Sequence, residues 1–373
     1  MKKRISWITG DYFIDVDLPI IVELSAKYDI FWQIIISPNN TIDYQQMVDR
    51  HMEGVGGSVN VSYIQLSHRA RSPKSIAEYW RIVSRAKKYQ PDLFYIAFNG
   101  MPYALPIFRW RLPLKKCIVA CHNVTTPKGA GSEYYARIYT NAWLHTFKNI
   151  QVFSSGQEKA LRENYSGKCV LCAPLAIKNY GDNHKPRTAN HSQVVFLFFG
   201  NIVSYKRLDI LLEAANQLYD EGIRNFRVKI AGSCHNWSQY EPLLRNREIF
   251  DTDIRRIPNE EITTLFESGD FFVMPYQDIA QSGAMMVAVN YSMPVIASDL
   301  PSFRDVLHQD ETAFFFESGS TADLVKQMKK AIGCYHQVYD TMCYHVGELK
   351  KSFLPSSISL LYDHFFKQLM GKV

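Results

Sequence analysis

Short apolar runs alternate with longer amphipathic segments through the first half of the chain. Mostly apolar runs of strand length lie at residues 5–9, 30–36, 61–66, 93–98, 117–121 and 150–153, and stretches near 75–89, 132–147 and 156–164 are expected to be helices. Buried parallel strands joined by helical crossovers have this pattern. We therefore expect a first Rossmann-like domain over residues 1–178.

The alternation resumes after a polar stretch, residues 179–192, which is rich in turn-forming residues and is expected to be a linker. Mostly apolar runs recur at 194–199, 228–231, 271–274, 294–297 and 313–316, and a further strand is expected at 254–257. Helical segments are expected near 208–218, 260–267 and 321–332. They predict a second Rossmann-like domain over residues 193–350. Residues 351–373 are expected to hold an amphipathic helix that packs back across the domains. The predicted fold class is α/β, with two Rossmann-like αβα domains facing a cleft.

The stretch 269–299 holds the clearest candidate for a binding site. A strand at 271–274, a loop and an apolar helix that begins at Gln281, Ser282 and Gly283 would form a βαβ unit with the strand at 294–297. The first N–H groups of that helix would lie at the carboxyl edge of a parallel sheet, where they attract an anion such as a diphosphate. The alternative is that Ser282 and Gly283 only cap a core helix.

Two polar residues of the first half lie at the ends of predicted elements. Asp17 precedes Pro19 and is expected to cap a helix, a role that we favour over an Asp-x-Asp metal motif with Asp15. His122 directly follows the run 117–121, and ligands bind at the carboxyl ends of parallel strands. A lone histidine at such a place is also compatible with a structural role.

Composition limits the class of protein. A chain of 373 residues exceeds what one hydrophobic core usually serves, in agreement with two domains. The sequence has neither an uninterrupted apolar run of the roughly 18 residues that span a membrane nor the pattern of a signal peptide, so we expect a cytoplasmic location. Seven cysteines, an odd number spread thinly, predict reduced thiols, and Cys169 and Cys172 are expected in a buried strand rather than at a metal.

Charge is distributed unevenly between the halves. Residues 1–178 contain 23 Lys and Arg against 13 Asp and Glu, a net charge of +10, whereas the remainder contains 19 against 23, a net charge of −4. An anionic membrane surface is the partner that we expect, with ordinary solvated helix faces as the alternative. Nucleic acid is not expected, because no recognised binding motif accompanies the charge. The basic residues cluster at Arg69, Arg71 and Lys74, at Arg81, Arg85, Lys87 and Lys88, and at Arg109, Arg111, Lys115 and Lys116.

Several segments of the second half occur in a specific order: FFGNIVSYKRLDILLEA, VKIAGS, RRIPNEEITTLFESGDFFVMPY and QSGAMMVAVNYSMPVIASDLPSFRDV. From about residue 196 to 332 this order resembles the donor-binding domain of family 4 glycosyltransferases, which have the two-domain GT-B fold. It is most similar to bacterial members that carry Gln-Ser-Gly in this helix and act on cell-envelope polysaccharides. The first half matches more loosely, through CHNVTTP and FSSGQEKAL.

The resemblance implies transfer of a sugar from a nucleotide-diphosphate sugar to an acceptor hydroxyl, with retention and without a bound metal or cofactor. The expected acceptor is a lipid-linked saccharide, an oligosaccharide or a polysaccharide, reached at the inner face of the plasma membrane. Two alternatives are a non-catalytic, glycosyltransferase-like subunit or binding module and a GT-B nucleotide-sugar epimerase.

Site residues follow from the resemblance position by position. Lys206 would hold the donor diphosphate by its charge, while Gly200 would let the backbone approach it and Gly232 would form the tight turn of the next strand. Ile257 falls where the family reads the base through main-chain groups. His122 would face the donor sugar as a candidate catalytic residue.

This chain departs from the family pattern in its acidic and basic side chains. The two glutamates of the Glu-x7-Glu motif fall at Ile279 and Val287, and the family arginine falls at Asn201. Candidate replacements are Asp278 for the first, catalytic glutamate, Arg207 for the arginine and Asp299 for the glutamate that accepts the ribose hydroxyls.

Overall fold

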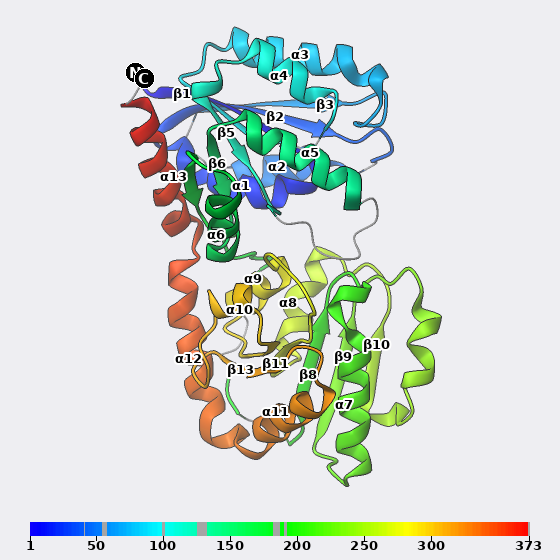
Figure 1. Ribbon diagram of the computed structural model, residues 1–373. Coiled ribbons are helices and arrows are strands. Elements are labelled where there is room, and N and C mark those ends of the chain that lie inside the picture. The colour runs from blue at the N-terminus through cyan, green and yellow to red at the C-terminus, as the bar shows by residue number, and fades with distance from the viewer. Residues whose placement is uncertain are drawn as a thin grey trace. The chain divides into compact units, whose positions relative to one another are not determined.

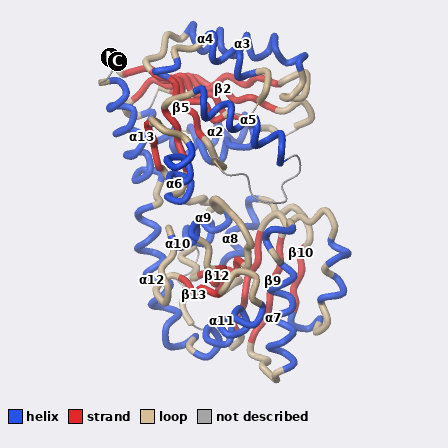
Figure 2. The backbone as a smooth tube through the Cα atoms, viewed as in Figure 1, coloured by secondary structure: helices blue, strands red, loops and turns tan. Residues whose placement is uncertain are grey.

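The computed structural model describes residues 1–40, 42–53, 58–98, 101–124, 133–181, 187–189 and 192–371. These residues divide into two compact units, one made of 1–176 with 354–373 and the other of 177–353. Each unit is built on a parallel sheet covered by helices on both faces, as Figures 1 and 2 show. The prediction of two Rossmann-like αβα domains is therefore confirmed. The linker predicted at 179–192 lies partly outside the described residues.

The first unit holds a seven-stranded sheet among its described residues, in the order β3-β2-β1-β4-β5-β6-β7. Its strands are β1 (Lys3–Gly10), β2 (Tyr28–Ile36), β3 (Val59–Gln65), β4 (Leu93–Ala97), β5 (Cys117–Ala120), β6 (Asn149–Val152) and β7 (Cys169–Cys172). Its helices are η1 (Asp11–Phe13), α1 (Ile14–Ser25), α2 (Tyr44–Met52), η2 (Pro73–Ser75), α3 (Ile76–Lys88), α4 (Ala104–Arg111), η3 (Leu114–Lys116), α5 (Glu133–Thr146), α6 (Ser155–Asn164) and α13 (Pro355–Met370).

Helices α3 to α6 cover one face of this sheet, and the buried faces of these helices and strands form a single apolar core. α1 and α13 pack together on the opposite face (Figure 1). There Tyr362 and Phe366 of α13 contact Trp7 and Tyr95 of the central strands, with ring centroids 5.9–6.5 Å apart. The last helix of the chain is therefore part of the core of the first unit.

The second unit holds a six-stranded parallel sheet among its described residues, in the order β10-β9-β8-β11-β12-β13. Its strands are β8 (Val194–Phe199), β9 (Phe226–Ala231), β10 (Phe250–Asp253), β11 (Phe271–Met274), β12 (Val295–Ser298) and β13 (Ala313–Phe316). Its helices are η4 (Ser204–Lys206), α7 (Leu208–Asp220), η5 (Trp237–Gln239), η6 (Glu241–Leu243), η7 (Arg247–Ile249), α8 (Asn259–Glu267), α9 (Gly283–Asn290), α10 (Pro301–Arg304), α11 (Thr321–Gly333) and α12 (Tyr335–Ser352).

The strand order of the second sheet reverses between β8 and β11. The chain moves outward from β8 to β9 and β10, then crosses back through α8 to pair β11 with the other side of β8. Loops that follow neighbouring strands at such a switch point diverge, which leaves room for a ligand at the carboxyl edge of the sheet. The turn after β8 and the loop after β11 both lie at this edge.

Two local predictions are wrong. α1 begins at Ile14, so Asp17 lies inside the helix and does not cap it. Asp17 is buried and accepts hydrogen bonds from Thr9 Oγ1 (2.6 Å) and Trp7 Nε1 (3.0 Å). The edge strand β10 is Phe250–Asp253, and residues 254–257, which were expected to be the strand, form a loop.

Arg187 anchors the described part of the predicted linker to the second unit. Its guanidinium donates to the carbonyl oxygens of Phe266, Gly269 (2.7 Å) and Tyr291 (2.6 Å). These carbonyls lie at the carboxyl ends of α8 and α9, where helix carbonyls lack intrahelical partners and cations are favoured. Arg187 thus ties the start of this unit to the two helices around β11.

None of the described helices has both the length and the apolar composition that crossing a membrane would need.

Candidate functional site

The turn after β8 buries a lysine at the switch point of the second sheet. Gly200 follows the strand with φ +109°, and η4 then carries Lys206 back towards it. A β-carbon placed on Gly200 would lie 3.0 Å from Lys206 Nζ. The ammonium group therefore lies against bare backbone at the carboxyl edge of the sheet.

Lys206 is 7% exposed, and among the described residues no carboxylate lies within ion-pair distance of its Nζ. The aromatic rings of Tyr276 and Phe198 lie near it, with centroids 5.4 and 6.0 Å from Nζ. Burial lowers the pKa of Lys206 to about 8, because the charged form loses hydration. A buried cation without a carboxylate is a ready site for an anion.

Gly232 explains the shape of this turn. A β-carbon at Gly232, which has φ +145°, would lie 2.0 Å from the carbonyl oxygen of Gly200. The two turns are also joined by hydrogen bonds from Gly200 N to Ala231 O (3.0 Å) and from Ile202 N to Ser233 O (2.8 Å). Gly232 thus has a structural role in positioning Gly200 beneath the lysine.

The loop after β11 meets the lysine turn. Gln277 N donates to Tyr205 O (2.8 Å), and the rings of Tyr205 and Tyr276 make an edge contact with centroids 6.0 Å apart. This loop leads into α9, so the amino end of α9 belongs to the same edge of the sheet as Lys206.

The amino end of α9 combines capping with further N–H donors. Ser282 Oγ accepts from Met285 N (3.2 Å), and Met286 N donates to Ser282 O (3.3 Å). The capping interpretation is therefore correct for the Ser282 side chain, whereas the N–H groups of Gly283 and Ala284 belong to the first turn, which has no intrahelical acceptors. Gln281 is partly buried just before the cap. A β-carbon at Gly283 would lie 3.2 Å from both Cε and Nζ of Lys178.

Arg207 follows the lysine in the left-handed region, with φ 48° and ψ 47°. Its guanidinium binds the carboxylate of Asp209 through Nε (3.0 and 3.1 Å) and Nη2 (2.8 Å), and it contacts Gln277 Oε1 at 3.5 Å. The hydrogen bond with Asp209 raises the pKa of Arg207. Its charge is already balanced, unlike that of Lys206.

The acidic candidates lie outside the buried part of the site. Asp278 is exposed in the loop after β11, and Asp299 forms an ion pair with Arg304 at 2.6 Å after β12. At the two glutamate positions of the family motif, Ile279 is partly buried and Val287 is buried within α9. Val287 packs in the core, so its position contributes no polar group.

Ile257 lies in the loop between β10 and α8 rather than at the end of a strand, and its side chain is partly exposed. The main-chain groups that continue the sheet edge here belong instead to Asp253, whose carbonyl accepts from Gly232 N (3.0 Å).

His122 lies two residues beyond β5 in the first unit, near the point where that strand order reverses between β1 and β4. Its imidazole stacks between Phe13, with centroids 3.6 Å apart and planes at 10°, and Phe153, at 4.0 Å and 23°. The two phenyl rings fix the plane of the imidazole and leave only its edge for polar contacts.

Residues 193–333 match the family model described as "Glycosyl transferases group 1". The matched range begins at β8 and includes Gly200, Lys206, Gly232 and the amino end of α9. This part of the chain is therefore similar to the group 1 domain of glycosyltransferases.

One curated protein and several solved structures are similar to this chain over more residues than the family model matches. The sulfoquinovosyl transferase SQD2 of Arabidopsis thaliana is 22% identical over 281 residues, which are 69% of this chain and 53% of that protein, so the chain spans about half of its curated relative's length. A glycosyltransferase from Rickettsia africae has a TM-score of 0.75 at 14% identity, covering all of both chains. HepE of Anabaena, solved with UDP and glucose, has a TM-score of 0.72 at 12% identity, covering 98% of this chain and 100% of HepE. Similarity at this level shows the fold, which is GT-B.

Sequence reasoning missed three residues around Lys206 and the amino end of α9. The ring of Tyr276 lies near the lysine, and Tyr205 makes an edge contact with that ring. Their positions next to Pro275 and Lys206 are the sequence signal for this role. Lys178 lies 105 positions before Gly283, and no local pattern links the two. His122 is outside the matched range, so its role stays a prediction.

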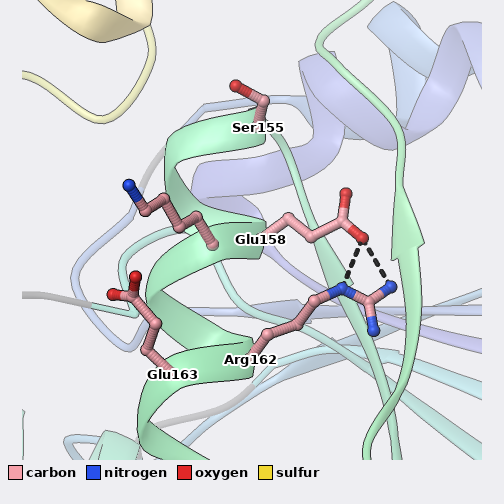
Figure 3. A pocket seen from close by; sticks show the side chains of 5 residues that line it. Ser155, Glu158, Arg162 and Glu163 are labelled. Atoms are coloured by element: carbon pink, nitrogen blue, oxygen red, sulfur yellow. Dashed lines mark hydrogen bonds and ion pairs between the residues drawn. The ribbon is translucent and has the colours of Figure 1, made fainter.

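Figure 3 shows a hollow on the outer surface of α6, lined by Ser155, Glu158, Lys159, Arg162 and Glu163. Arg162 donates to Glu158 Oε1 through Nε (2.9 Å) and Nη2 (2.6 Å), one turn along the helix. All five residues belong to one exposed helix, and the candidate residues of the group 1 domain are not among them. Among the described residues, no three His, Cys, Asp or Glu side chains group closely enough to hold a metal ion, and metal independence stays a prediction.

Proposed function

We propose that the chain transfers a sugar from a nucleotide-diphosphate sugar to an acceptor hydroxyl, with the donor diphosphate bound between Lys206 and the amino end of α9. The observation that carries this proposal is the buried Lys206 ammonium, which lies against Gly200 with no carboxylate partner among the described residues. A diphosphate would offset the loss of hydration of this cation. Fixed positive charge of this kind also stabilises the negative charge that develops on a departing diphosphate.

Lys178 is proposed as a second ligand of the diphosphate. Its Nζ lies against Gly283, at the start of a helix whose dipole already favours an anion. The family arginine is replaced by Asn201, whose Oδ1 accepts from Ser233 Oγ (3.2 Å), and Arg207 is paired with Asp209. Lys178 would therefore supply the cation that the motif lacks.

The donor and acceptor are proposed from the relatives and from charge. HepE was solved with UDP and UDP-glucose, so a UDP-sugar is the first donor to test. The basic first half of the chain favours a lipid-linked or polysaccharide acceptor at the inner face of the plasma membrane. Retention and the absence of a cofactor are proposed on the resemblance alone.

A non-catalytic, nucleotide-binding subunit is the second candidate. Ile279 and Val287 stand where the family has two glutamates, and Val287 is buried among apolar residues. Binding of the ribose would then depend on other groups, and sugar transfer would depend on His122 and Asp278.

The test is isothermal titration of the full chain with UDP, GDP and dTDP, followed by turnover of the matching nucleotide sugars with and without saccharide acceptors. Lys206→Met and Lys178→Met are each expected to weaken nucleotide binding by roughly 10- to 100-fold, since each removes a hydrogen bond to a charged group. Lys326→Met, at an exposed lysine of the same unit, is the matched control.

The outcomes separate the candidates. Nucleotide binding that depends on Lys206, together with sugar transfer, supports the proposal, whereas binding without turnover supports the non-catalytic subunit. Isomerisation of the sugar without an acceptor would indicate an epimerase. If none of the three nucleotides binds, the proposed donor site is rejected. If only the Lys178 variant binds normally, the second ligand alone is rejected.

A further inference from the structure

Two tryptophans are exposed side by side on the outer surface of the first unit. Trp80 of α3 and Trp110 of α4 are 42% and 74% exposed, with ring centroids 5.6 Å apart. Figure 1 shows α3 and α4 packed next to each other over the first sheet. Ile76, one turn before Trp80 on the same face of α3, is 46% exposed. These residues form an apolar surface patch, which we name the Trp80–Trp110 patch.

The patch is fixed in place by a cation. The guanidinium of Arg111 lies over the Trp80 ring at 3.9 Å, and its Nη2 contacts Ser84 Oγ at 3.5 Å. Arg111 Nη1 is buried without a hydrogen-bond partner in the described structure. The arginine thus packs on one face of the indole and keeps part of its own hydrogen-bonding capacity unused.

The segment that carries the patch is rich in basic residues. Residues 69–116 contain eleven Lys and Arg but only two acidic residues, Glu78 and Asp92. Glu78 is buried and accepts from Ser67 N (2.6 Å), and Asp92 accepts from Lys3 Nζ (3.2 Å) and Arg4 N (2.9 Å). Within the described part of the chain, no ion pair neutralises the exposed cations next to the patch, which are Arg81, Arg85, Lys87, Lys88, Arg109 and Lys115.

We infer that the Trp80–Trp110 patch docks the protein on an anionic lipid surface. Indole rings are favoured at the headgroup level of a bilayer, where the ring is shielded from water and its N–H remains hydrated. The neighbouring cations would reach lipid phosphates, because the apolar stems of lysine and arginine side chains can lie at this depth while their charged ends stay in water. Exposed indoles flanked by unpaired cations match a bilayer surface in both apolar and charged character. The inference does not depend on the proposed donor chemistry.

The experiment is sedimentation of the full chain with vesicles of phosphatidylcholine alone or with 30 mol% phosphatidylglycerol, at roughly 0.1 M salt. We expect binding only to the anionic vesicles, and a blue shift of tryptophan emission on binding. Trp7, Trp32 and Trp143 are fully buried, and Trp237 is partly buried in the second unit, so loss of the shift in W80S/W110S would assign it to the patch. Vesicles made with brominated lipids are expected to quench the same emission.

Two variants test the parts of the patch, and a third is a control. W80S/W110S is expected to lose at least tenfold in vesicle affinity and to lose the emission shift. R81Q/R85Q is expected to lose roughly 25-fold, at about fivefold per charge. K148Q/K159Q, which removes two exposed lysines elsewhere on the same unit, is the matched control and is expected to bind like the unaltered chain. Circular dichroism and thermal unfolding report whether each variant is folded, independently of the lipid.

Each remaining result overturns the inference. Equal loss in K148Q/K159Q would mean diffuse electrostatic adsorption without a specific surface. Normal vesicle binding by W80S/W110S would remove the tryptophans from the interface. Binding to a single-stranded oligonucleotide but not to anionic vesicles would assign the cations to nucleic acid.

Discussion

The ammonium nitrogen of Lys206 occupies the space that a side chain at Gly200 would take, 3.0 Å from the position of the absent β-carbon. The glycine therefore serves two purposes, since it permits φ +109° and leaves its α-carbon bare beneath the cation. The relationship places an uncompensated charge in a buried position, which costs stability unless an anion binds.

Replacing Lys206 by methionine should stabilise the free protein. The pKa of Lys206 is lowered from 10.5 to about 8, so at pH 7 the charged lysine costs about 3 kcal/mol relative to an unperturbed one. We expect the K206M variant to have a free energy of unfolding that is higher by about that amount in urea titrations at pH 7. The gain should shrink between pH 8 and 10.5, because there the unfolded chain holds the proton that the folded lysine has lost. A destabilised K206M would contradict a buried, unpaired charge.

Nucleotide affinity should depend on the protonation of Lys206. The diphosphate binds the charged form, so affinity should be constant below pH 8 and fall about tenfold per pH unit above it, until the higher pKa of the complex is reached. Titration with UDP between pH 6.5 and 10 measures this. Lys206→Arg is the control, since an arginine keeps its charge throughout this range and should bind with a flat profile.

Gly232→Ala should destabilise the protein and displace Gly200 from its position next to Lys206. The new β-carbon would lie 2.0 Å from Gly200 O, at a residue with φ +145°. We expect a loss of roughly 2–5 kcal/mol in the free energy of unfolding, from overpacking and backbone strain together, and a loss of UDP binding as Gly200 is displaced. Gly222→Ala is the matched control, because Gly222 has φ +90° but open space around it, so only the strain should appear. Equal effects of both changes would show that contact with Gly200 is unimportant.

Arg207→Gly distinguishes a structural arginine from a phosphate ligand. Glycine removes the cost of about 1 kcal/mol for a left-handed residue with a side chain, and the lost, partly exposed pair with Asp209 contributes at most about as much. We expect the free energy of unfolding to change by less than about 1 kcal/mol and UDP affinity by less than about threefold. A tenfold weaker affinity would assign Arg207 to the diphosphate, as the sequence predicted.

Asp17→Asn should change how stability depends on pH. Burial raises the pKa of Asp17 from 3.8 to about 7, against the lowering effect of the hydrogen bonds from Thr9 and Trp7. The folded state therefore holds this proton between pH 4 and 7, and the contribution of Asp17 to stability falls as pH rises through that window. We expect the free energy of unfolding of D17N relative to the unaltered chain to rise by a few kcal/mol from pH 4 to 8.

Asp363 provides the control of opposite sign for this measurement. Burial opposes its ionisation, but hydrogen bonds from Lys27, Tyr28 and Lys367 lower its pKa to about 2. Its contribution to stability is present above pH 4 and lost as pH falls, so Asp363→Asn should be most destabilising at neutral pH. Parallel pH profiles for the two variants would contradict the assigned pKa directions.

The buried parallel strands could be predicted from the sequence, because a strand covered on both faces must be continuously apolar. The predicted runs at 194–199, 271–274 and 313–316 coincide with β8, β11 and β13. The edge strand β10 could not be placed this way, since its residues are only partly buried or exposed, so that it carries Asp251 and Asp253 and needs no apolar run. The prediction fell instead on the neighbouring residues 254–257, which contain Ile254 and Ile257.

The candidate site was predictable where it depends on local chain geometry and not where it depends on distant contacts. The spacing of Gly200 and Lys206 within one turn is visible in the sequence. The contact of Lys178 with Gly283 and the bonds of Arg187 to the carboxyl ends of α8 and α9 join segments about a hundred residues apart, so only the folded chain brings them together. Asp17 was misassigned because its partners Trp7 and Thr9 lie on a strand, which a capping rule does not consider.

The position of α13 in the core of the first unit has a consequence for the order of folding during synthesis. Residues 177–353 form a unit that is continuous in sequence, whereas the first unit needs Tyr362 and Phe366 to cover Trp7 and Tyr95. A ribosome that has made residues 1–353 has therefore supplied a complete second unit and a first unit in which only part of this face of the sheet is covered, by α1. The part of the chain that is made first is thus the last to complete its native packing.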